Sequence, residues 1–376
     1  MKNIFIIGSK GYNKYYGGWE TFTKNLIDNY NDSNTKFYVS EISIDDEEIY
    51  DVNNVTCMKI KSLNLGKASM LLYTMKSFRK VIKYIITNNI DNAIIYVLGL
   101  KLGPYLHLYK NKLKRNNIKV IVNPDGLEWN RDKWKWYVRL FFKYSLRTMI
   151  KNCNKIVCDS IGIKEYLKEY KEKTSYIAYG TNEVSIINEN EVLKEYNLDK
   201  NSYYLMVGRF VPENNYEVVI SEFMKSSSDK KLVIISNIEK NKYYKRLVDN
   251  TNFINDKRVI ILGSIYDVSK LSVLRKNAYA YIHGHSVGGT NPSLLESLSL
   301  TSVNVLYNCI FNKEVGRESC FYFDKSSNNL KKIIERVEKL DKKEINKLGS
   351  ECKKIIKENY TWDIIVDKYK EFLNNL

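Results

Sequence analysis

Short apolar segments alternate with amphipathic segments along almost the whole chain, and this alternation begins twice. The first series predicts strands at 3–7, 93–97, 120–122, 155–158 and 176–178. The second series predicts strands at 203–207, 232–235, 259–262, 279–282 and 303–306. Buried strands separated by helices form parallel sheets with right-handed crossovers. The pattern therefore predicts an α/β protein with two doubly wound, Rossmann-like domains and a cleft between them, where ligands collect at the carboxyl ends of the strands.

The length of the chain supports two domains of similar size. With 376 residues, it exceeds the size at which one hydrophobic core usually keeps growing, and 44% of its residues are hydrophobic. A polar, charged stretch at 180–200 is expected to join the domains. We place the N-terminal domain at 1–185 and the second domain at 186–355.

The chain is basic, with 60 Lys and Arg residues against 43 acidic ones and a formal charge of +17. This balance favours a polyanionic partner, which leaves nucleic acid, an anionic membrane and phosphorylated substrates open. Only residues 4–7 form an apolar run near the start, too short for a signal-peptide core, so a cytoplasmic protein is expected. Apolar runs fall well below the ~18 residues that span a bilayer, so any membrane association is expected to be peripheral. Six scattered cysteines and three histidines form no zinc-like pattern, and the cysteines are expected to be reduced core residues.

The segment HGHSVGGTNPSLLE, residues 283–296, places Gly288 and Gly289 between a predicted strand end and a predicted helix start. Thr290 to Pro292 supply an N-cap and an early helical proline. Unpaired N–H groups and the helix dipole would face a ligand phosphate there. Glu296, one turn inside the helix, can accept hydrogen bonds from ribose hydroxyls. The segment predicts a nucleotide-sugar site; the alternative is an ordinary glycine turn capped by Thr290, with Glu296 in solvent.

Two further groups follow strands of the second series. Arg209 comes after the strand at 203–207, where a guanidinium can hold two phosphate oxygens or form a surface ion pair. Asn214 and Asn215 come next as helix-start residues, a place where asparagine is a common N-cap. Of His283 and His285, expected to face opposite ways, one is predicted to reach the donor and the other to be structural. No third ligand accompanies them, so no metal site is predicted.

The loop after the first strand, GSKGYNKYYGGWETF, contains Gly17 and Gly18 before a helix that begins near Trp19. Its glycines do not match a dinucleotide fingerprint, and it has no Walker lysine. It predicts a second helix N-terminus on the ligand side of the sheet, with an ordinary β-to-α turn as the alternative.

Tryptophans and basic residues are mixed in NPDGLEWNRDKWKWYVRLFFKYSLR, which holds Trp129, Trp134 and Trp136. This composition is typical of an interfacial membrane helix, although RNA stacking uses similar residues. The alternative is a basic helix whose aromatic side chains pack inward. Asp125 and Glu128 precede the basic stretch, and either is a candidate acidic group near an acceptor hydroxyl.

Taken as a set, five motifs resemble the retaining GT-B glycosyltransferases of family 4, and more closely the bacterial rhamnosyltransferase branch that builds capsular and cell-wall polysaccharides. The motifs span nearly the whole chain: YYGGWETF, DGLEWNRDKW, GRFVPENN, HGHSVGGTNPSLLE and YTWDIIVDKY. The last resembles the terminal helix that crosses back to the first domain in this fold. The resemblance therefore implies a crossing helix over 356–376 that packs on the N-terminal domain.

The resemblance also assigns roles to individual residues. The donor site implied comprises Gly17, Gly18, Arg209, Asn214, His283, Gly288, Gly289, Thr290, Asn291, Pro292, Ser293 and Glu296. Within it Arg209 would bind the diphosphate, the amides of 289–293 would face phosphate and sugar, and Glu296 would hold the ribose. Arg209, Asp125 and Glu20 are the catalytic candidates. Acceptor or membrane contact is assigned to Glu128, Trp129, Arg131, Trp134 and Trp136.

Two positions depart from the family pattern. Family 4 usually has a glutamate where this chain has Gly288, and often a lysine where Asn214 stands. The first change removes a carboxylate that commonly contacts the donor sugar, which fits a 6-deoxy sugar bound differently. The second change removes a positive charge from the diphosphate site, so Arg209 and the helix N-termini must provide more of the interaction with the diphosphate.

The resemblance implies transfer of L-rhamnose from dTDP-rhamnose to a lipid-linked saccharide at the cytoplasmic face of the membrane. No cofactor or metal is expected, and nucleic acid is not an expected partner. A near alternative is the same fold using UDP-glucose, UDP-galactose or another sugar nucleotide. An alternative of another class is a non-catalytic RNA-binding protein that uses the +17 charge and the tryptophan segment.

Overall fold

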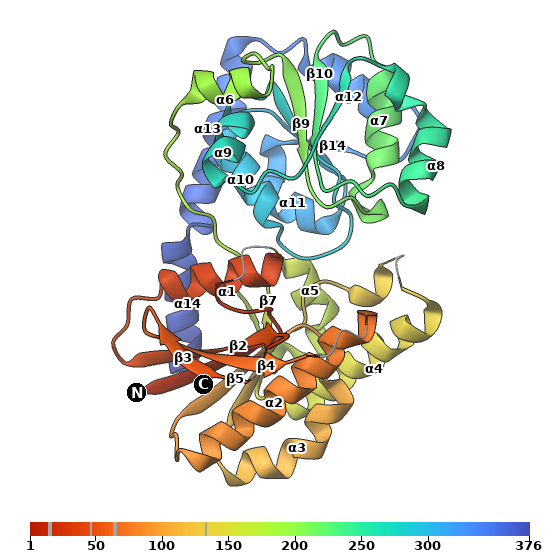
Figure 1. Cartoon of the computed structure of the whole chain (residues 1–376). Helices are drawn as coiled ribbons and strands as arrows, with labels where there is room; N and C mark the ends of the chain where they lie inside the picture. The colour runs from red at the N-terminus through yellow and green to blue at the C-terminus, as the bar shows by residue number, and fades with distance from the viewer. Residues whose placement is uncertain (14–16, 46, 63–65, 132–133) are drawn as a thin grey trace. The chain divides into compact units, whose positions relative to one another are not determined.

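A computed structural model gives the fold of the chain and describes residues 1–13, 17–45, 47–62, 66–131 and 134–376 (Figure 1). The chain divides into two compact units. The N-terminal unit comprises Met1–Tyr179 and Ile365–Leu376, and the C-terminal unit comprises Gly180–Ile364. Each unit is a sheet with helices on its faces, the doubly wound arrangement that the alternating pattern predicts.

The sheet of the N-terminal unit has the order β3-β4-β2-β1-β5-β6-β7-β8. Its strands are β1 (Lys2–Ile7), β2 (Thr35–Ser43), β3 (Ile49–Val52), β4 (Val55–Lys61), β5 (Ala93–Leu98), β6 (Lys119–Asn123), β7 (Lys155–Cys158) and β8 (Thr174–Tyr176). All neighbouring strands are parallel except β3, which runs antiparallel to β4 at one edge. Every side chain of β5 is buried, as expected for a central strand covered on both faces.

The helices of the N-terminal unit are α1 (Gly18–Asp28), α2 (Ser69–Thr87), α3 (Gly103–Arg115), α4 (Trp136–Asn152) and α5 (Ile161–Tyr166). The last helix, α14 (Trp362–Asn374), also reaches this unit. Its Tyr369 hydroxyl lies 2.8 Å from that of Tyr96 in β5, and its ring is 6.0 Å from the ring of Phe22 in α1. These contacts place the end of the chain against the centre of the N-terminal sheet.

The C-terminal unit has a fully parallel sheet with the order β11-β10-β9-β12-β13-β14. Its strands are β9 (Tyr203–Val207), β10 (Lys231–Ile235), β11 (Val259–Leu262), β12 (Ala280–His283), β13 (Asn304–Tyr307) and β14 (Phe321–Phe323). Its helices are α6 (Glu189–Glu195), α7 (Tyr216–Met224), α8 (Lys242–Thr251), α9 (Val268–Asn277), α10 (Pro292–Leu300), α11 (Ile310–Gly316), α12 (Asn329–Val337) and α13 (Lys342–Asn359). One core packs the sheet against α7, α8 and α12, and the other packs it against α6 and α9.

The predicted strands match the structure closely at all but one place. Nine of the ten predicted strands overlap β1, β5 to β7 and β9 to β13 along most of their length, whereas 176–178 begins only at the last residue of β8. The stretch 180–200, predicted to join the domains, starts the C-terminal unit and contains the helix α6. Val192 and Leu193 of that helix are buried in the core of the C-terminal unit, so the polar composition concealed a short amphipathic helix.

The remaining fold-level observations concern cysteines, metals and membranes. All six cysteines are free thiols, and five of them are buried. Among the described residues, no group of three or more His, Cys, Asp and Glu side chains could hold a metal ion. In the same part of the chain, every helix is too short or too polar to cross a bilayer.

Candidate functional site

The strand order of the C-terminal unit reverses between two adjacent strands. From β9 the chain continues to β10 on one side, and from β12 it continues to β13 on the other side. At such a reversal the loops after the two strands diverge and leave a crevice at the carboxyl edge of the sheet. The loop at 208–215 follows β9, and the loop at 284–291 follows β12. The predicted donor residues of this unit thus lie on two loops of one ligand-binding edge.

Two asparagine side chains tie these loops together. The Asn214 amide donates to the carbonyl of Arg209 at 2.7 Å, and its Oδ1 lies 2.9 Å from Nδ1 of His285. The Asn215 amide donates to the carbonyl of Gly284 at 2.7 Å. The alternative that these asparagines serve as side-chain N-caps of α7 is wrong, because neither side chain caps the helix. Their side chains instead fix the distance between the loops.

The contact between the loops is close enough to require glycine. A Cβ atom on Gly284 would lie 2.0 Å from the Asn214 carbonyl oxygen, far inside van der Waals contact. Ser286 adds two bonds, from its N–H at 3.0 Å and its hydroxyl at 2.8 Å, both to the carbonyl of Glu213. The two loops therefore behave as one preorganised unit.

Arg209 follows β9 at this edge and is exposed to solvent. Its guanidinium makes no ion pair with any residue that the structure describes, so the alternative of a surface ion pair is not observed. Its carbonyl is held by Asn214, which fixes the backbone from which the side chain extends. A guanidinium in this position is available for the oxygens of a phosphate.

The N-terminus of α10 is capped by Asn291 rather than by Thr290. The Asn291 side chain accepts the N–H of Ser293 at 2.9 Å, and Pro292 has no N–H to offer. Of the predicted amides at 289–293, the one at Ser293 is therefore already bonded. This moves the predicted contact with a phosphate towards the glycine-containing part of the loop, at Gly288 and Gly289.

His285 covers the position where family 4 usually has a glutamate. Gly288 has a φ of +153°, and a Cβ there would lie 2.7 Å from Nε2 of His285. A side chain at Gly288 would therefore be both strained and blocked. The imidazole, held through Asn214, occupies the space beside this part of the loop.

The two histidines do not face opposite ways, as expected from sequence. The rings of His283 and His285 are 5.9 Å apart, because residues two apart in extended backbone project to the same side. His283 is buried, and burial with the nearby Arg275 charge lowers its pKa to about 3. His285 is only partly buried, so it is the histidine that a ligand on this edge can reach.

Glu296 is held by an arginine that the sequence reading missed. Arg275 of α9 is 3% exposed, and its Nη2 lies 2.6 Å from Oε2 of Glu296 and 3.1 Å from Oγ of Ser293. The hydroxyl of Tyr281 lies 2.9 Å from the same Oγ. The Glu296 side chain itself is 37% exposed, so Arg275 orients the carboxylate while part of it remains accessible to solvent. No local sequence pattern signals this pair, because Arg275 and Glu296 lie on different helices.

In the N-terminal unit, Glu20 closes the loop after β1. The side chain is buried and its Oε1 accepts the N–H of Lys10 at 2.7 Å. Gly17 has a φ of +134°, and a Cβ on it would lie 1.9 Å from Oε2 of Glu20. Gly18 is the first residue of α1. Glu20 thus holds both ends of the loop, while Tyr15 and Tyr16 of the same motif lie outside the described residues.

The acidic candidates after β6 differ in how fully they are engaged. Both oxygens of Glu128 have partners: Oε1 forms an ion pair with Arg131, 2.6 Å from its Nε, and Oε2 accepts the indole N–H of Trp134 at 3.0 Å. Asp125 is paired less closely, since Nη2 of Arg131 lies 3.8 Å away and a backbone hydrogen bond comes from Gly126. Partial burial raises the pKa of Asp125, although the arginine charge opposes the rise. Asp125 is therefore the better candidate of the two to meet an acceptor hydroxyl.

A lysine missed in the sequence belongs to the same cluster. Lys101 follows β5, and its charge interacts with Glu128, Asp125 and Glu20. Burial lowers the pKa of Lys101, and the three carboxylates counteract this shift. β1 and β5 are adjacent at the strand reversal of this sheet, so loops after both strands meet at one edge. The sequence signal that could have identified Lys101 is its place in the loop after the buried strand β5.

The tryptophan segment divides into buried and exposed parts. Trp129 is buried with its ring 5.4 Å from that of Tyr166, and Arg131 is buried beside Glu128. The prediction of membrane contact is wrong for Trp129, whose ring is part of the fold. Trp136, at the start of α4, is 72% exposed. Asp132 and Lys133 of this motif lie outside the described residues.

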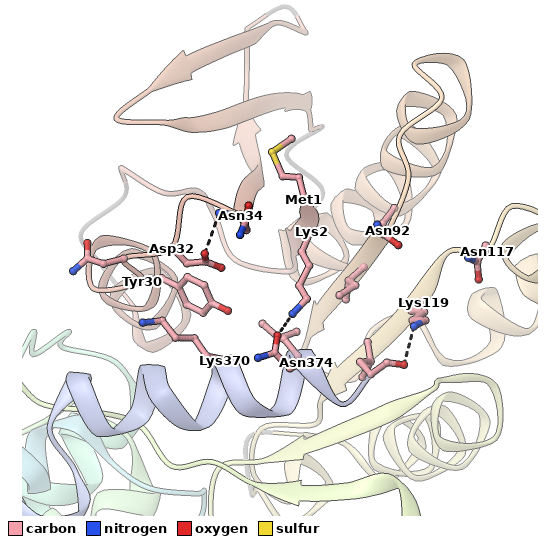
Figure 2. Close-up of a pocket in the computed structure, with 15 residues that line it drawn as sticks. Met1, Lys2, Tyr30, Asp32, Asn34, Asn92, Asn117, Lys119, Lys370 and Asn374 are labelled. Carbon is pink, nitrogen blue, oxygen red and sulfur yellow. Dashed lines mark hydrogen bonds between the residues drawn. The ribbon is translucent and has the colours of Figure 1, made fainter.

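A large cavity lies at the opposite edge of the N-terminal sheet. Its volume is about 790 Å³, and it is lined by the first residues of β1, β5 and β6 and by the end of α14 (Figure 2). Lys2 bonds to Asn374 there, and the Lys119 ammonium donates to the Leu376 carbonyl at 2.7 Å. The strands begin at this edge, so the cavity is separate from the candidate residues at their carboxyl ends.

Two protein-family models match consecutive parts of the chain. Residues 1–182 match a domain of unknown function (DUF1972), and residues 188–362 match glycosyl transferases group 1. The second match covers both loops of the C-terminal edge and Glu296 of α10. No curated protein matches the chain significantly.

Solved structures resemble the whole chain. Sucrose-phosphate synthase from Thermosynechococcus elongatus is 14% identical, with a TM-score of 0.78 over 100% of this chain and 99% of that one. HepE from Anabaena, solved in complex with UDP, is 14% identical with a TM-score of 0.74 over the full length of both chains. A glycosyltransferase from Rickettsia africae is 15% identical, with a TM-score of 0.74 over 100% of this chain and 98% of that one.

These likenesses confirm the predicted GT-B architecture, with two α/β domains built on parallel sheets. The match to glycosyl transferases group 1 spans almost all of the C-terminal unit. The chain thus has the GT-B fold, and its C-terminal half matches a glycosyltransferase family model.

Proposed function

We propose that the protein transfers L-rhamnose from dTDP-rhamnose, with retention, to a lipid-linked saccharide in the synthesis of a bacterial capsular or cell-wall polysaccharide. The reaction takes place at the cytoplasmic face of the membrane, with the protein associated peripherally. It needs a nucleoside diphosphate sugar as substrate and no added cofactor or metal.

The observation that carries this proposal is the pair of bonded loops at the β9–β12 reversal. They bring together an exposed guanidinium, a glycine-containing loop ahead of α10 and a carboxylate on α10. Arg209 and the loop amides suit the diphosphate of a donor. Glu296, oriented by Arg275, suits the free 3′-hydroxyl of the thymidine sugar, which can donate to the carboxylate.

The chemistry asked of these residues is electrostatic. In a retaining transfer of this type the departing phosphate accepts the proton of the attacking hydroxyl on the same face, so no covalent nucleophile is required. Negative charge grows on the diphosphate as the sugar leaves, and Arg209 stabilises it more in the transition state than in the ground state. Asp125 acts on the acceptor side, where its engagement is the weakest of the cluster.

The identity of the donor rests on the loop at Gly288. With glycine there and the His285 ring beside it, the loop lacks a carboxylate for the donor sugar, which suits a 6-deoxy sugar with one hydroxyl fewer. UDP-glucose is the second candidate donor, since HepE has been solved in complex with UDP-glucose and shares this fold.

The test is a transfer assay with purified full-length protein, without added metal. The donors are dTDP-rhamnose, UDP-glucose, UDP-galactose and GDP-mannose, each offered with a synthetic lipid-linked monosaccharide acceptor, and the anomeric configuration of the product is read by NMR. We expect turnover of dTDP-rhamnose with the anomeric configuration retained. Turnover confined to a UDP sugar would reassign the donor, and an inverted product would overturn the mechanism.

A further inference from the structure

One face of α4 exposes large apolar side chains that the fold does not use. Trp136, Tyr137, Leu140 and Tyr144 are 72%, 53%, 55% and 60% exposed. The opposite face of the helix is buried in the N-terminal unit, where Ser145 receives the N–H of Gly103 at 2.9 Å. Exposed apolar residues are normal when scattered, but four within nine residues on one helix face form a patch.

Basic residues run beside this patch at a regular spacing. Every fourth residue from the start of the helix region is cationic: Lys135, Arg139, Lys143, Arg147 and Lys151. The apolar residues Trp136, Leu140 and Tyr144 repeat with the same spacing, so the two rows lie side by side along the helix. The segment 134–152 contains no acidic residue.

The cations of the exposed face are not used by the fold. Lys143, Arg147 and Lys151 are exposed and form no ion pair with any residue in the described part of the chain. Arg139 is the exception, because its Nε donates to the carbonyl of Trp134 at 2.9 Å and holds the start of the helix. Three exposed cations beside an aromatic patch therefore lack a counterion.

The direction of α4 places the aromatic end near the candidate acceptor residues. The helix connects β6 to β7 in a parallel sheet, so it begins at the carboxyl edge and runs towards the amino edge. Asp125 lies between β6 and α4 at that same carboxyl edge. Trp136 thus stands at the end of the N-terminal unit that carries the acidic candidates, and Lys151 stands at the other end.

We propose that this face of α4, defined by Trp136, Tyr137, Leu140, Lys143, Tyr144, Arg147 and Lys151, is the surface by which the protein docks on an anionic phospholipid bilayer. Tryptophan and tyrosine rings settle at the level of lipid headgroups, because one part of each ring system is apolar and another is polar. The three lysine and arginine side chains meet the headgroup phosphates, and a face without carboxylates meets no repulsion.

Membrane docking goes beyond the proposed transfer of rhamnose. It rests on that reaction only because a lipid-linked acceptor gives the protein a reason to bind a membrane. A lipid-linked acceptor must be reached from the membrane surface, and docking through α4 would present the acceptor edge of the N-terminal unit to that surface. Binding to lipid itself requires no donor, so the two ideas can fail separately.

The test is flotation of purified full-length protein with vesicles of phosphatidylcholine alone or of phosphatidylcholine mixed with phosphatidylglycerol. We expect binding to the anionic vesicles only, weakened by salt because exposed charges are screened. Replacing Lys143, Arg147 and Lys151 with glutamine should weaken binding on the order of 100-fold, from about fivefold for each cation. Equal binding by this variant and the wild type would overturn the assignment.

A second variant and two matched controls separate the aromatic contribution from general effects of substitution. Trp136→Ser, Leu140→Ser and Tyr144→Ser together should also abolish flotation. The matched apolar control replaces Ile254, Tyr266 and Val268, which are exposed to similar extents in the C-terminal unit. The matched charge control replaces Lys347, Lys354 and Lys357 of α13 with glutamine. Both controls should float like the wild type, and melting temperatures should be equal throughout.

Other occupants of the face give distinct outcomes. Loss of a dimer in the α4 variants, without vesicle binding by the wild type, would assign the face to self-association. RNA binding that the same variants abolish, again without vesicle binding, would assign it to nucleic acid. Either result overturns membrane docking. Donor hydrolysis in the same samples reports on the proposed reaction independently, because the α4 variants leave the donor residues intact.

Discussion

The two carboxyl sheet edges hold their candidate residues in different ways. In the C-terminal unit, neutral amide groups hold the loops: the side chains of Asn214 and Asn215 hydrogen bond one loop to the other. In the N-terminal unit, charged groups hold the candidate residues, because Glu128 forms an ion pair with Arg131 and the charge of Lys101 interacts with three carboxylates. This difference fits the two proposed roles. The hydrogen-bonded loops of the C-terminal unit bind the diphosphate, and the charged cluster of the N-terminal unit contacts the acceptor.

The largest effect on turnover is expected at the hydrogen-bonded loops of the C-terminal unit. Arg209→Ala should lower turnover by about 10²- to 10³-fold, the loss seen when one preorganised donor to a developing charge is removed. The fold should remain intact, because the side chain is exposed. Turnover with saturating donor and the melting temperature are the measurements. Arg246→Ala is the matched control, since Arg246 is also exposed but lies on α8 beside Glu217. Equal turnover in the two variants would remove Arg209 from the site.

The next effect sharpens the contrast within the acceptor cluster. Asp125→Asn should lower transfer by about 10²-fold, at the low end of general acid–base effects, with the melting temperature unchanged. Glu128→Gln should lower the melting temperature and leave the transfer rate nearly unchanged, because it breaks a buried ion pair with Arg131 at 2.6 Å. The comparison is of transfer rate against melting temperature for the two variants. A strong rate loss only in Glu128→Gln would exchange their roles.

A smaller effect is expected in donor binding. Glu296→Ala should weaken donor affinity by about 10- to 100-fold, as for the loss of hydrogen bonds to a charged group, and leave the maximal rate nearly unchanged. Titration calorimetry with the nucleoside diphosphate measures it directly. Glu335→Ala on α12 is the control, since its carboxylate has a similar exposure and lies in an ion pair with Lys331. Unchanged affinity in Glu296→Ala contradicts the ribose role.

The smallest effect concerns stability and the buried His283 of the C-terminal unit. Burial sets the pKa of His283 at about 3, below its usual value of about 6.5. The unfolded chain therefore binds more protons between these values, so the contribution of His283 to stability is complete above pH 6.5 and is lost as the pH falls towards 3. The loss is at most about 1.4 kcal/mol per pH unit.

The measurement for His283 is the melting temperature from pH 7 to pH 4 in the wild type and in His283→Gln. As the pH falls, the melting temperature of the wild type should drop more steeply than that of the variant. This comparison of slopes holds even if the two proteins have different melting temperatures at pH 7. Parallel curves would show that the imidazole is not held neutral by burial.

The fold could be predicted largely from sequence, because buried parallel strands are near-continuous apolar runs that stand out from the helices around them. The strands at 203–207 and 259–262 were predicted to the residue. The short helix α6 was missed because polar residues outnumber its two buried ones, Val192 and Leu193.

The candidate site could be predicted only in part. Residues on loops after strands, such as Arg209 and Asp125, follow from the rule that ligands collect at carboxyl edges. Arg275 could not be found this way, because it reaches Glu296 from another helix, across a distance in sequence that no local pattern encodes. The bonds from Asn214 to the loop after β12 were hidden for the same reason, and asparagine before a helix gave the misleading prediction of a cap.

The central claim is that the bonded loops of the C-terminal unit bind a nucleoside diphosphate sugar, and ligand-induced stabilisation tests it most directly. We would measure the melting temperature of the wild type and of Arg209→Ala with dTDP, UDP, dTDP-rhamnose and UDP-glucose, without added metal. A ligand at about 100 times its dissociation constant stabilises by about 2.7 kcal/mol, so a real donor gives a clear shift. We expect dTDP and dTDP-rhamnose to stabilise the wild type, and Arg209→Ala to lose most of this stabilisation. No shift with any nucleotide, or equal shifts in both proteins, would contradict it.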